Sequence, residues 1–477
     1  MTSAVFVMDI EIQKIEEDML GRIYASDEAG QVHHKLCSFG SRFAGTASEK
    51  RAVNFILMKL KEYGLTNVHT EEFEYNGWWR GTTKFEVVSP VRRVLPAVGL
   101  PWSPSTPEEG VEAEFLNLGD GMKADYELQG DQVSGKIVMT SAFTPPWMRS
   151  THRCEKMGRA EKLGAKGFIY MKNDPGMLEE TGVATWSCPK EMGRIADFPS
   201  VGISRETGAY LTRLQKDGPV RVKITMKHRV GPAIGWNVMG DISGDRGNGE
   251  MLIIGAHFDG HDISVGAMDD AGGTCVTVEA ARVLAKHANS LRRTLRFILY
   301  PGEEVGCFGS TAYTNQHRKE MDSVRFMLNL DAAGRGNRPG ILLQGFPESS
   351  TFFRQLGKEM KMPLRTGVSF GLYSDHMPYA LEGIETATLP PGDTFRASAG
   401  TRGFGHTAAD TEDKVDIRDL QESAALVARI MLRLGIRDNL PMRRRSTSEV
   451  KAMLDAYALY EVMDVQRGIP PSLRGKR

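Results

Sequence analysis

Imidazole and carboxylate side chains, the groups that bind divalent cations, gather in one stretch of the sequence. His257 and Asp259 lie close together, and Asp269 and Asp270 follow within Gly266-Ala-Met-Asp-Asp. Such side chains suit borderline-hard ions such as Zn²⁺, Mn²⁺ or Co²⁺, and the absence of Cys from the set argues against a structural zinc site. The stretch predicts half of a metal site. The alternative at this point is that Asp269 or Asp270 caps the helix that follows.

Further acidic and imidazole groups follow apolar runs later in the chain. Glu303 and Glu304 come after Leu299-Tyr-Pro-Gly, Asp331 comes after Met327-Leu-Asn-Leu, and His406 lies in a loop. Taken singly, each is typical of a surface pair, a helix cap or an ordinary loop residue. Their joint occurrence predicts one site. Two ions ~3.5–4 Å apart would need one carboxylate to bridge them and would leave room for a shared water.

The elements that carry these residues are predicted to be buried strands alternating with helices. Short apolar runs typical of strands lie at 251–256, 294–300, 324–330, 340–343 and 385–389. Helical patterns lie at 272–287, 310–320, 349–361 and 417–434. The alternation predicts an α/β sheet covered on both faces. In such sheets the carboxyl ends of the strands open onto the ligand crevice, where the candidate side chains would meet.

The rest of the chain has a different pattern. Helices are predicted at 9–36 and 48–63 and strands at 70–75 and 83–88. Around Pro96 the composition shifts, and β-like runs continue without any cluster of acidic residues and His. We therefore predict a domain inserted at 95–230 within a catalytic domain formed by 1–94 and 231–436. Residues 437–477 are predicted to form a helical extension, with one capped helix at 446–465.

Composition restricts the function classes. The 477 residues contain 60 Lys and Arg against 60 Asp and Glu, so no bulk electrostatic attraction to nucleic acid or an anionic membrane is expected. The five Cys are scattered and show no metal-ligand spacing, which fits a reducing compartment better than a disulfide framework. No run reaches the ~18 apolar residues of a spanning helix, and the first residues lack signal-peptide features. We expect a cytoplasmic protein, and homo-oligomerisation is left open.

These motifs together resemble the zinc aminopeptidase and glutamate carboxypeptidase family of co-catalytic metallo-exopeptidases. The resemblance rests on the motifs at His257, Asp269, Glu303, Asp331 and His406 and covers most of 38–90 and 231–435. The insertion resembles a protease-associated domain, and the sequence is most similar to the branch of plasma glutamate carboxypeptidase-like dipeptidases. The resemblance implies a three-layer α/β/α peptidase domain with a mixed central sheet, interrupted by a smaller β-rich protease-associated domain. That domain is expected to wall one side of the cleft and to provide no ligand.

The resemblance also implies roles for individual residues. One metal ion would be bound by His257, Asp269 and Asp331 and a second by Asp269, Glu304 and His406, with Asp269 as the bridge. Glu303 would be the general base that takes a proton from the bridging water, and Asp259 would hydrogen-bond a ligand imidazole. Tyr373 and His376 lie in a motif that resembles a loop near the site and are candidates for contacts to the transition state. We interpret the remaining His and Asp residues in these regions as structural or peripheral, namely His261, Asp262, His287 and His317.

The predicted function is hydrolysis of peptide bonds at a chain terminus by an enzyme with two divalent ions, Zn²⁺ or else Co²⁺ or Mn²⁺. An aminopeptidase or dipeptidase is favoured, because carboxypeptidases need an Arg cluster for the terminal carboxylate and only Arg396 and Arg402 lie near a motif loop. Three alternatives stay open: a carboxypeptidase of the glutamate carboxypeptidase type, a single-zinc acyltransferase of the glutaminyl cyclase type, and an inactive binding protein.

Overall fold

Apolar strands in the second half of the chain form the centre of the first of two eight-stranded sheets. The structure, a computed structural model, describes residues 3–186, 192–244, 249–336, 339–390 and 403–466, with Gly468 and Leu473. The strands of the first sheet, in spatial order, are β1 Thr66–Trp79, β10 Arg229–Ile242, β12 Thr294–Tyr300, β11 Met251–His257, β13 Val324–Asn329, β16 Thr386–Thr388, β14 Gly340–Gln344 and β15 Arg365–Ser369. β11 is parallel to β12 and β13, whereas β10 is antiparallel to β12, so the sheet is mixed.

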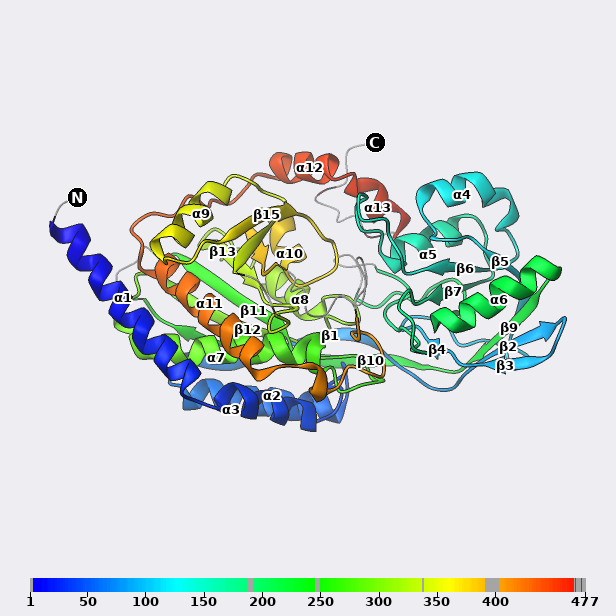
Figure 1. Ribbon diagram of the computed structural model, residues 1–477, viewed down its shortest axis with the longest axis horizontal. Helices are drawn as coiled ribbons and strands as arrows, with labels where there is room; N and C mark the ends of the chain where they lie inside the picture. The colour runs from blue at the N-terminus through cyan, green and yellow to red at the C-terminus, as the bar shows by residue number, and fades with distance from the viewer. Residues whose placement is uncertain are drawn as a thin grey trace.

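Both faces of this sheet are covered by helices. Leu252 and Ile254 of β11 pack with one set of helices, and Ile253 between them packs with another. The first set is α1 Ser3–Tyr24, α2 Glu28–Ser38, α3 Ala47–Glu62, α7 Gly272–Leu284, α9 Ser350–Glu359 and α11 Ile417–Ile436. The second set is α8 Phe308–Gln316 and α10 His376–Leu381. Strands buried on both faces are apolar throughout, as β11 is. The predicted three-layer α/β/α arrangement is confirmed (Figure 1).

A second sheet forms a separate part of the molecule, on the right in Figure 1. Its strands, in spatial order, are β3 Arg93–Leu95, β2 Thr83–Ser89, β9 Arg221–Met226, β5 Val111–Asn117, β6 Ile137–Ser141, β7 Gly167–Met171, β8 Ser200–Ile203 and β4 Val98–Gly99. Its helices are α4 Lys123–Gln129, α5 Arg153–Lys162 and α6 Arg205–Asp217. β2 lies before residue 95, so this sheet begins earlier than the predicted insertion. The domain boundaries themselves stay a prediction.

Two connections join the parts. The first connection is the pair β1 and β10, which runs from Thr66 opposite Asp241 to Trp79 opposite Arg229. The chain leaves β1 to enter the second part at β2, and it returns from β9 into β10. The second connection consists of the C-terminal helices α12 Thr447–Ala456 and α13 Leu459–Val465, which lie across the top in Figure 1. On α13, Glu461 pairs with Lys123 and Arg159 of the second part at 3.0 and 2.9 Å.

Two helices predicted as continuous are each broken in the structure. The predicted helix at 9–36 is interrupted between α1 and α2, where the Ser26 hydroxyl accepts a hydrogen bond from the Glu28 backbone N–H. The predicted helix at 446–465 is interrupted before α13, where Ala458 has a left-handed φ of 53°. The apolar spacing continues across both breaks, so it did not indicate them. α6 and β15 were not predicted.

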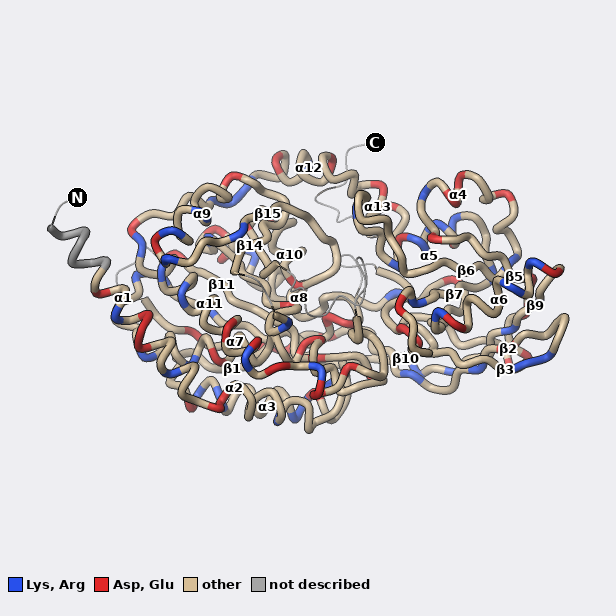
Figure 2. Tube along the Cα trace, viewed as in Figure 1, with Lys and Arg blue, Asp and Glu red and all other residues tan. Residues whose placement is uncertain are grey.

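The distribution of charge agrees with the balanced composition. Figure 2 shows Lys and Arg interspersed with Asp and Glu along both parts of the chain. Among the residues that the structure describes, no helix combines the length and the apolar character needed to cross a membrane.

Candidate metal centre

The candidate side chains lie where three parallel strands of the first sheet end. His257 is the last residue of β11, Glu303 and Glu304 follow β12, and Asp331 follows β13. Parallel strands present their carboxyl ends at the same edge of a sheet, which brings these three segments together. His406 reaches the same place from a loop far along the chain and lies 3.2 Å from Glu304, between Nε2 and Oε2. The structure thus gathers all five predicted ligands.

One group of possible ligands consists of His257, Asp269 and Asp331. Its ligand atoms all lie within 4.8 Å of one another. His257 Nε2 is 3.5 Å from Asp269 Oδ1 and 3.9 Å from Asp331 Oδ1. His257 Nε2 is also buried without a hydrogen-bond partner among the described residues. A buried imidazole nitrogen that faces two carboxylates without a hydrogen bond fits a metal ligand.

A second group consists of Glu304, His406 and His261, which the sequence analysis interpreted as structural or peripheral. These three ligand atoms also lie within 4.8 Å of one another. His261 Nε2 is 3.0 Å from Glu304 Oε2, and the two imidazole rings stand edge to face with centroids 4.3 Å apart. The interpretation of His261 as peripheral is therefore wrong about its position. Asp262, His287 and His317 belong to neither group and form ion pairs with Arg80, Asp18 and Glu71 respectively.

Asp269 faces both groups. Its Oδ1 is directed to His257, and its Oδ2 lies 3.6 Å from His406 Nε2. Its backbone is held by Asp410, whose carboxylate accepts hydrogen bonds from the N–H groups of Met268 and Asp269 at 2.7 and 3.1 Å. The Arg335 guanidinium lies 3.1 Å from Oδ1. The arrangement is that of a carboxylate able to bridge two cations, with one oxygen for each.

Asp259 positions the Glu303-Glu304 segment. Its Oδ1 and Oδ2 accept hydrogen bonds from the backbone N–H groups of Glu303 and Glu304 at 3.1 and 3.2 Å. Its Oδ1 also lies 3.4 Å from His257 Nδ1, which is 3.1 Å from the Asp259 backbone oxygen. One carboxylate therefore links the strand end that carries His257 to the loop that carries both glutamates.

The two glutamates differ in electrostatics. Burial raises the pKa of Glu303 well above its usual value. Burial acts on Glu304 in the same direction, but the charges of His261 and His406 outweigh it and hold the pKa of Glu304 below its usual range. Neighbouring carboxyls whose surroundings separate their pKa values are typical of a pair with different roles. Glu304 is suited to remain an anionic ligand, and Glu303 is suited to carry a proton.

The two candidates for contact with the transition state, Tyr373 and His376, have other hydrogen-bond partners. Tyr373 lines the same pocket as Glu303 and Asp331, and its hydroxyl accepts a hydrogen bond from Gln466. His376 is buried, and its Nε2 lies 3.0 Å from the Gly371 backbone oxygen. Their contact with a transition state stays a prediction. Asp270 accepts a hydrogen bond from the Gly273 N–H at 2.9 Å, as expected of a residue at the start of α7. Arg396 and Arg402 lie outside the described residues.

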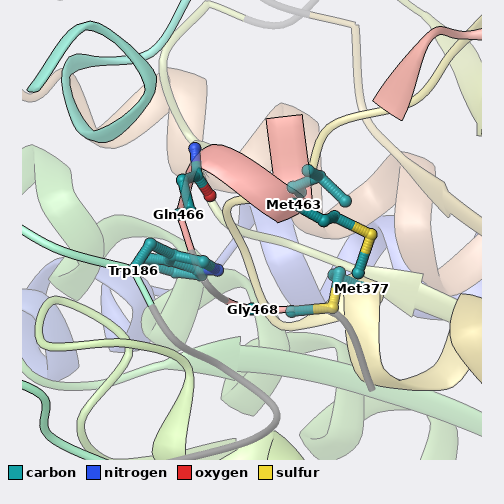
Figure 3. A pocket seen from close by; sticks show the side chains of 6 residues that line it. Trp186, Met377, Met463, Gln466 and Gly468 are labelled. Atoms are coloured by element: carbon teal, nitrogen blue, oxygen red, sulfur yellow. The ribbon is translucent and has the colours of Figure 1, made fainter. Parts of the chain in front are cut away.

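The second part of the molecule forms a wall of the pocket, as predicted. His152, Arg153, Val183 and Trp186 line it opposite the acidic residues. The ring of His152 stacks on Tyr373 with centroids 3.7 Å apart. Trp186 also lines a neighbouring pocket, shown in Figure 3, where Gln466 and Gly468 lie beside it and Met463 and Met377 lie across from it. The wall is therefore packed with both the C-terminal segment and α10. Three segments distant in sequence meet there.

The wall also contacts a candidate ligand directly. His406 Nδ1 lies 3.2 Å from the Thr181 backbone oxygen, and the Thr181 N–H donates a hydrogen bond to the His406 backbone oxygen at 2.8 Å. A backbone carbonyl on the second nitrogen of a ligand imidazole fixes its tautomer and orientation. The second part provides none of the grouped ligands, but it supports one of them.

Several of the supporting residues were missed in the sequence. Asp410 and Arg335 hold Asp269, Ser374 donates a hydrogen bond to Asp331 at 2.6 Å, and Arg42 donates to the backbone oxygens of Phe258 and Gly266 at 2.6 and 2.9 Å. Asp410 lies in the motif of His406, Ser374 lies between Tyr373 and His376, and Arg42 begins Arg-Phe-Ala-Gly-Thr, which also resembles the family. Arg335 acts through a contact that no spacing in the sequence indicates.

Comparisons with known proteins agree with this geometry. Residues 237–431 match Peptidase family M28, and residues 107–211 match the PA domain. Aminopeptidase YwaD of Bacillus subtilis (strain 168) is 26% identical over 426 residues, which cover 87% of this chain and 86% of that protein. Carboxypeptidase Q of Bos taurus is 26% identical over 393 residues, 82% of this chain and 81% of that protein. The solved structure of a Peptidase M28 precursor from Shewanella amazonensis SB2B has a TM-score of 0.76 at 23% identity and covers 92% of this chain and 99% of its own. By these matches, residues 237–431 form a Peptidase family M28 region and residues 107–211 a PA domain, which lies between β1 and β10 of the first sheet.

Proposed function

We propose that this chain is an exopeptidase with two zinc ions that removes residues from peptides with a free amino terminus, as an aminopeptidase or dipeptidase. The observation that carries the proposal is Asp269, whose two oxygens face two separate groups of possible ligands. His257 and Asp331 would complete one ion site, and Glu304 and His406 the other. When bound, such a pair of ions polarises the scissile carbonyl and makes water a better nucleophile.

Glu303 would act as the general base. It lies in the pocket beside Asp269 and Asp331, and burial favours its protonated form, so it can accept a proton and later return it to the leaving amine. Asp259 would hold Glu303 in place through its backbone N–H. The relatives named aminopeptidase and carboxypeptidase support a peptide substrate.

The partners of two guanidinium groups support recognition of an amine rather than a carboxylate. A carboxypeptidase needs Arg side chains available to the terminal carboxylate. Arg153 lines the pocket, but its Nε donates to the Val183 oxygen at 2.8 Å, and Arg335 pairs with Asp269. The acidic pocket residues are better suited to a protonated amine. The second candidate, a carboxypeptidase, is favoured by the relatives named carboxypeptidase Q.

The test compares the two chain termini. Purified protein saturated with Zn²⁺ is given a free dipeptide, an aminoacyl-anilide and the N-acetylated form of each. We expect the free compounds to be cleaved and the acetylated forms to be cleaved at least about 100-fold more slowly. Equal or faster cleavage of the acetylated dipeptide would instead identify a carboxypeptidase. Formation of a cyclised product without hydrolysis would identify an acyltransferase of the glutaminyl cyclase type.

A substitution of the proposed bridging residue, Asp269, tests the number of bound ions. Elemental analysis should find two zinc ions per wild-type chain. Asp269→Ala should retain at most one, because it removes a ligand of both ions at once. Two tightly bound ions in the variant would show that the bridge is assigned to the wrong residue.

A further inference from the structure

His261 is a buried imidazole for which the proposed two-ion site has no role. It is only 2% exposed, and neither of its ring nitrogens has a hydrogen-bond partner among the described residues. Leaving a buried polar group without a hydrogen bond destabilises the folded chain, so such groups are rare unless another partner, such as a bound ion, satisfies them. The feature therefore calls for a ligand.

The distances around His261 fit a metal ion. Ligand atoms at zinc–nitrogen and zinc–oxygen distances of about 2.0–2.2 Å in a tetrahedron lie roughly 3.4 Å apart. His261 Nε2 and His406 Nε2 lie 3.0 and 3.2 Å from the same atom, Glu304 Oε2. His406 Nε2 lies 3.6 Å from Asp269 Oδ2. His261, Glu304 and His406 thus converge with the spacing of one ion site, and Asp269 Oδ2 approaches that site beside His406.

The loop that carries His261 is held on both sides of it. A side chain at Gly260 would lie 3.0 Å from the Asp269 backbone oxygen, so glycine permits the close approach of the two loops. On the other side, Asp262 pairs with Arg80 through both oxygens, at 2.7 and 2.9 Å. The position of the imidazole is therefore built into the fold, as expected of a ligand side chain.

We infer that His261 is a fourth protein ligand of the ion held by Asp269, Glu304 and His406. The inference rests on the proposed two-ion function and makes the two sites unequal. Four protein ligands form a closed set, typical of structural zinc, whereas the three ligands His257, Asp269 and Asp331 leave a position open, as in catalytic zinc sites. The closed site should bind zinc more tightly, and the open site should be the one that exchanges its ion and accepts substrate.

The experiment measures zinc retained by the full-length chain during dialysis against increasing chelator. Wild-type protein should lose its two ions in separate steps. In His261→Leu and His261→Gln, the step at higher chelator concentration should move to a chelator concentration at least about tenfold lower. Even residues that only hydrogen-bond a ligand change metal affinity 10–100-fold. His287→Leu is the matched control, because His287 pairs with Asp18 on the surface, and its curve should equal that of the wild type.

The outcomes separate this inference from the proposed function. If wild-type protein retains two ions and both His261 variants release them like the wild type, His261 only pairs with Glu304 and the inference is overturned. If the wild type retains one ion, the two-ion function is overturned, and the variants still show whether His261 binds that ion. Far-ultraviolet circular dichroism of the metal-free variants checks that they are folded.

A second measurement needs no variant. In wild-type protein loaded with Co²⁺, the ¹H NMR spectrum should contain three paramagnetically shifted, exchangeable N–H signals. They would come from the ligand imidazoles of His257, His261 and His406. Two such signals would contradict the inference.

Discussion

Glu303 and Glu304 are neighbours in the chain but have different surroundings. Glu304 is directed at two imidazoles, 3.0 and 3.2 Å away, which favour its anionic form. Glu303 lies 4.0 Å from His257 Nε2, and burial raises its pKa. A change of one position in the sequence therefore separates the proposed ligand from the proposed general base.

Glu303→Gln tests this division. The variant should keep its zinc content and fold while kcat falls by about 10²-fold or more, because general acid–base catalysis typically contributes 10²–10⁴-fold. The measurements are steady-state kinetics on a free dipeptide and elemental analysis of the same sample. Glu304→Gln serves as the contrast, since it should lower zinc content as well. Unchanged kcat in Glu303→Gln would show that another group accepts the proton.

Glu49 provides a prediction that does not depend on the metal. This residue of α3 is fully buried, with one oxygen accepting from the Gly45 N–H at 2.8 Å and the other without a hydrogen bond among the described residues. Burial raises its pKa from 4.5 to about 8. Between these pH values the folded chain holds a proton that the unfolded chain has released, so the free energy of unfolding falls as pH rises from about 4.5 to 8.

Glu49→Gln removes this titration. The metal-free variant should gain stability over the metal-free wild type progressively from pH 5 to pH 8, by up to several kcal/mol, because each pKa unit corresponds to about 1.4 kcal/mol. Chemical denaturation at each pH measures the difference. Glu62→Gln, on the exposed side of the same helix, is the control. A difference that does not change with pH would mean that Glu49 is ionised in the folded state.

Among the structural elements, the loop around Thr181 connects the second part of the molecule, which contains the PA domain and is called the PA part below, to the candidate metal centre. Its backbone holds His406, and its side chain accepts a hydrogen bond from Arg80 at 3.1 Å. Arg80 also binds Asp262, next to His261. Beyond the predicted role as a wall of the cleft, the insertion therefore supports a candidate ligand, His406, through its backbone.

Arg80→Met should loosen this connection. We expect the affinity for the ion near His406 to fall by up to about tenfold, in line with the effect of other outer-shell changes. The check is a zinc titration of the full chain with a competing chelator. Arg93→Met is a suitable control, because Arg93 belongs to β3 and stacks on Tyr210, within the PA part. Equal affinities in all three proteins would mean that Thr181 positions His406 without help from Arg80.

For the molecule as a whole, the metal centre is a meeting point of distant segments. Candidate ligands lie at the ends of β11, β12 and β13, others come from the start of α7 and from the loop at His406, and the PA part contacts that loop. Several of these ligands are carboxylates that repel one another when no cation is present. Binding ions to the folded chain alone stabilises it by about 2.7 kcal/mol when the free ion is at 100 times its Kd.

Removal of metal should therefore lower the thermal stability of the whole chain. A chelator that strips the ions is expected to lower Tm by a few degrees, and added Zn²⁺ should restore it. Differential scanning calorimetry of one sample before chelation, after chelation and after reloading makes the comparison. An unchanged Tm after proven loss of both ions would mean that the folded ligand cluster does not need the cation.

The central strands and most of the candidate site residues could be predicted from the sequence alone. Continuous apolar runs such as 251–256 predicted strands buried on both faces, because only such strands bury side chains of both registers. The carboxylate and imidazole residues that follow those strands, among them His257, Glu304 and Asp331, were predicted to meet because parallel strands end at one edge of the sheet. Local patterns and strand direction were sufficient for these conclusions.

Which other groups reach the site became clear from the folded chain alone. The roles of His261, Arg335 and Thr181 depend on where loops from different parts of the fold come into contact, which no local pattern in the sequence indicates. The breaks near Ser26 and Ala458 were hidden for a related reason, because apolar spacing reports which face is buried and not where the backbone turns. Periodicity and motif order are local properties, whereas the shape and partners of a site are set by contacts between distant residues.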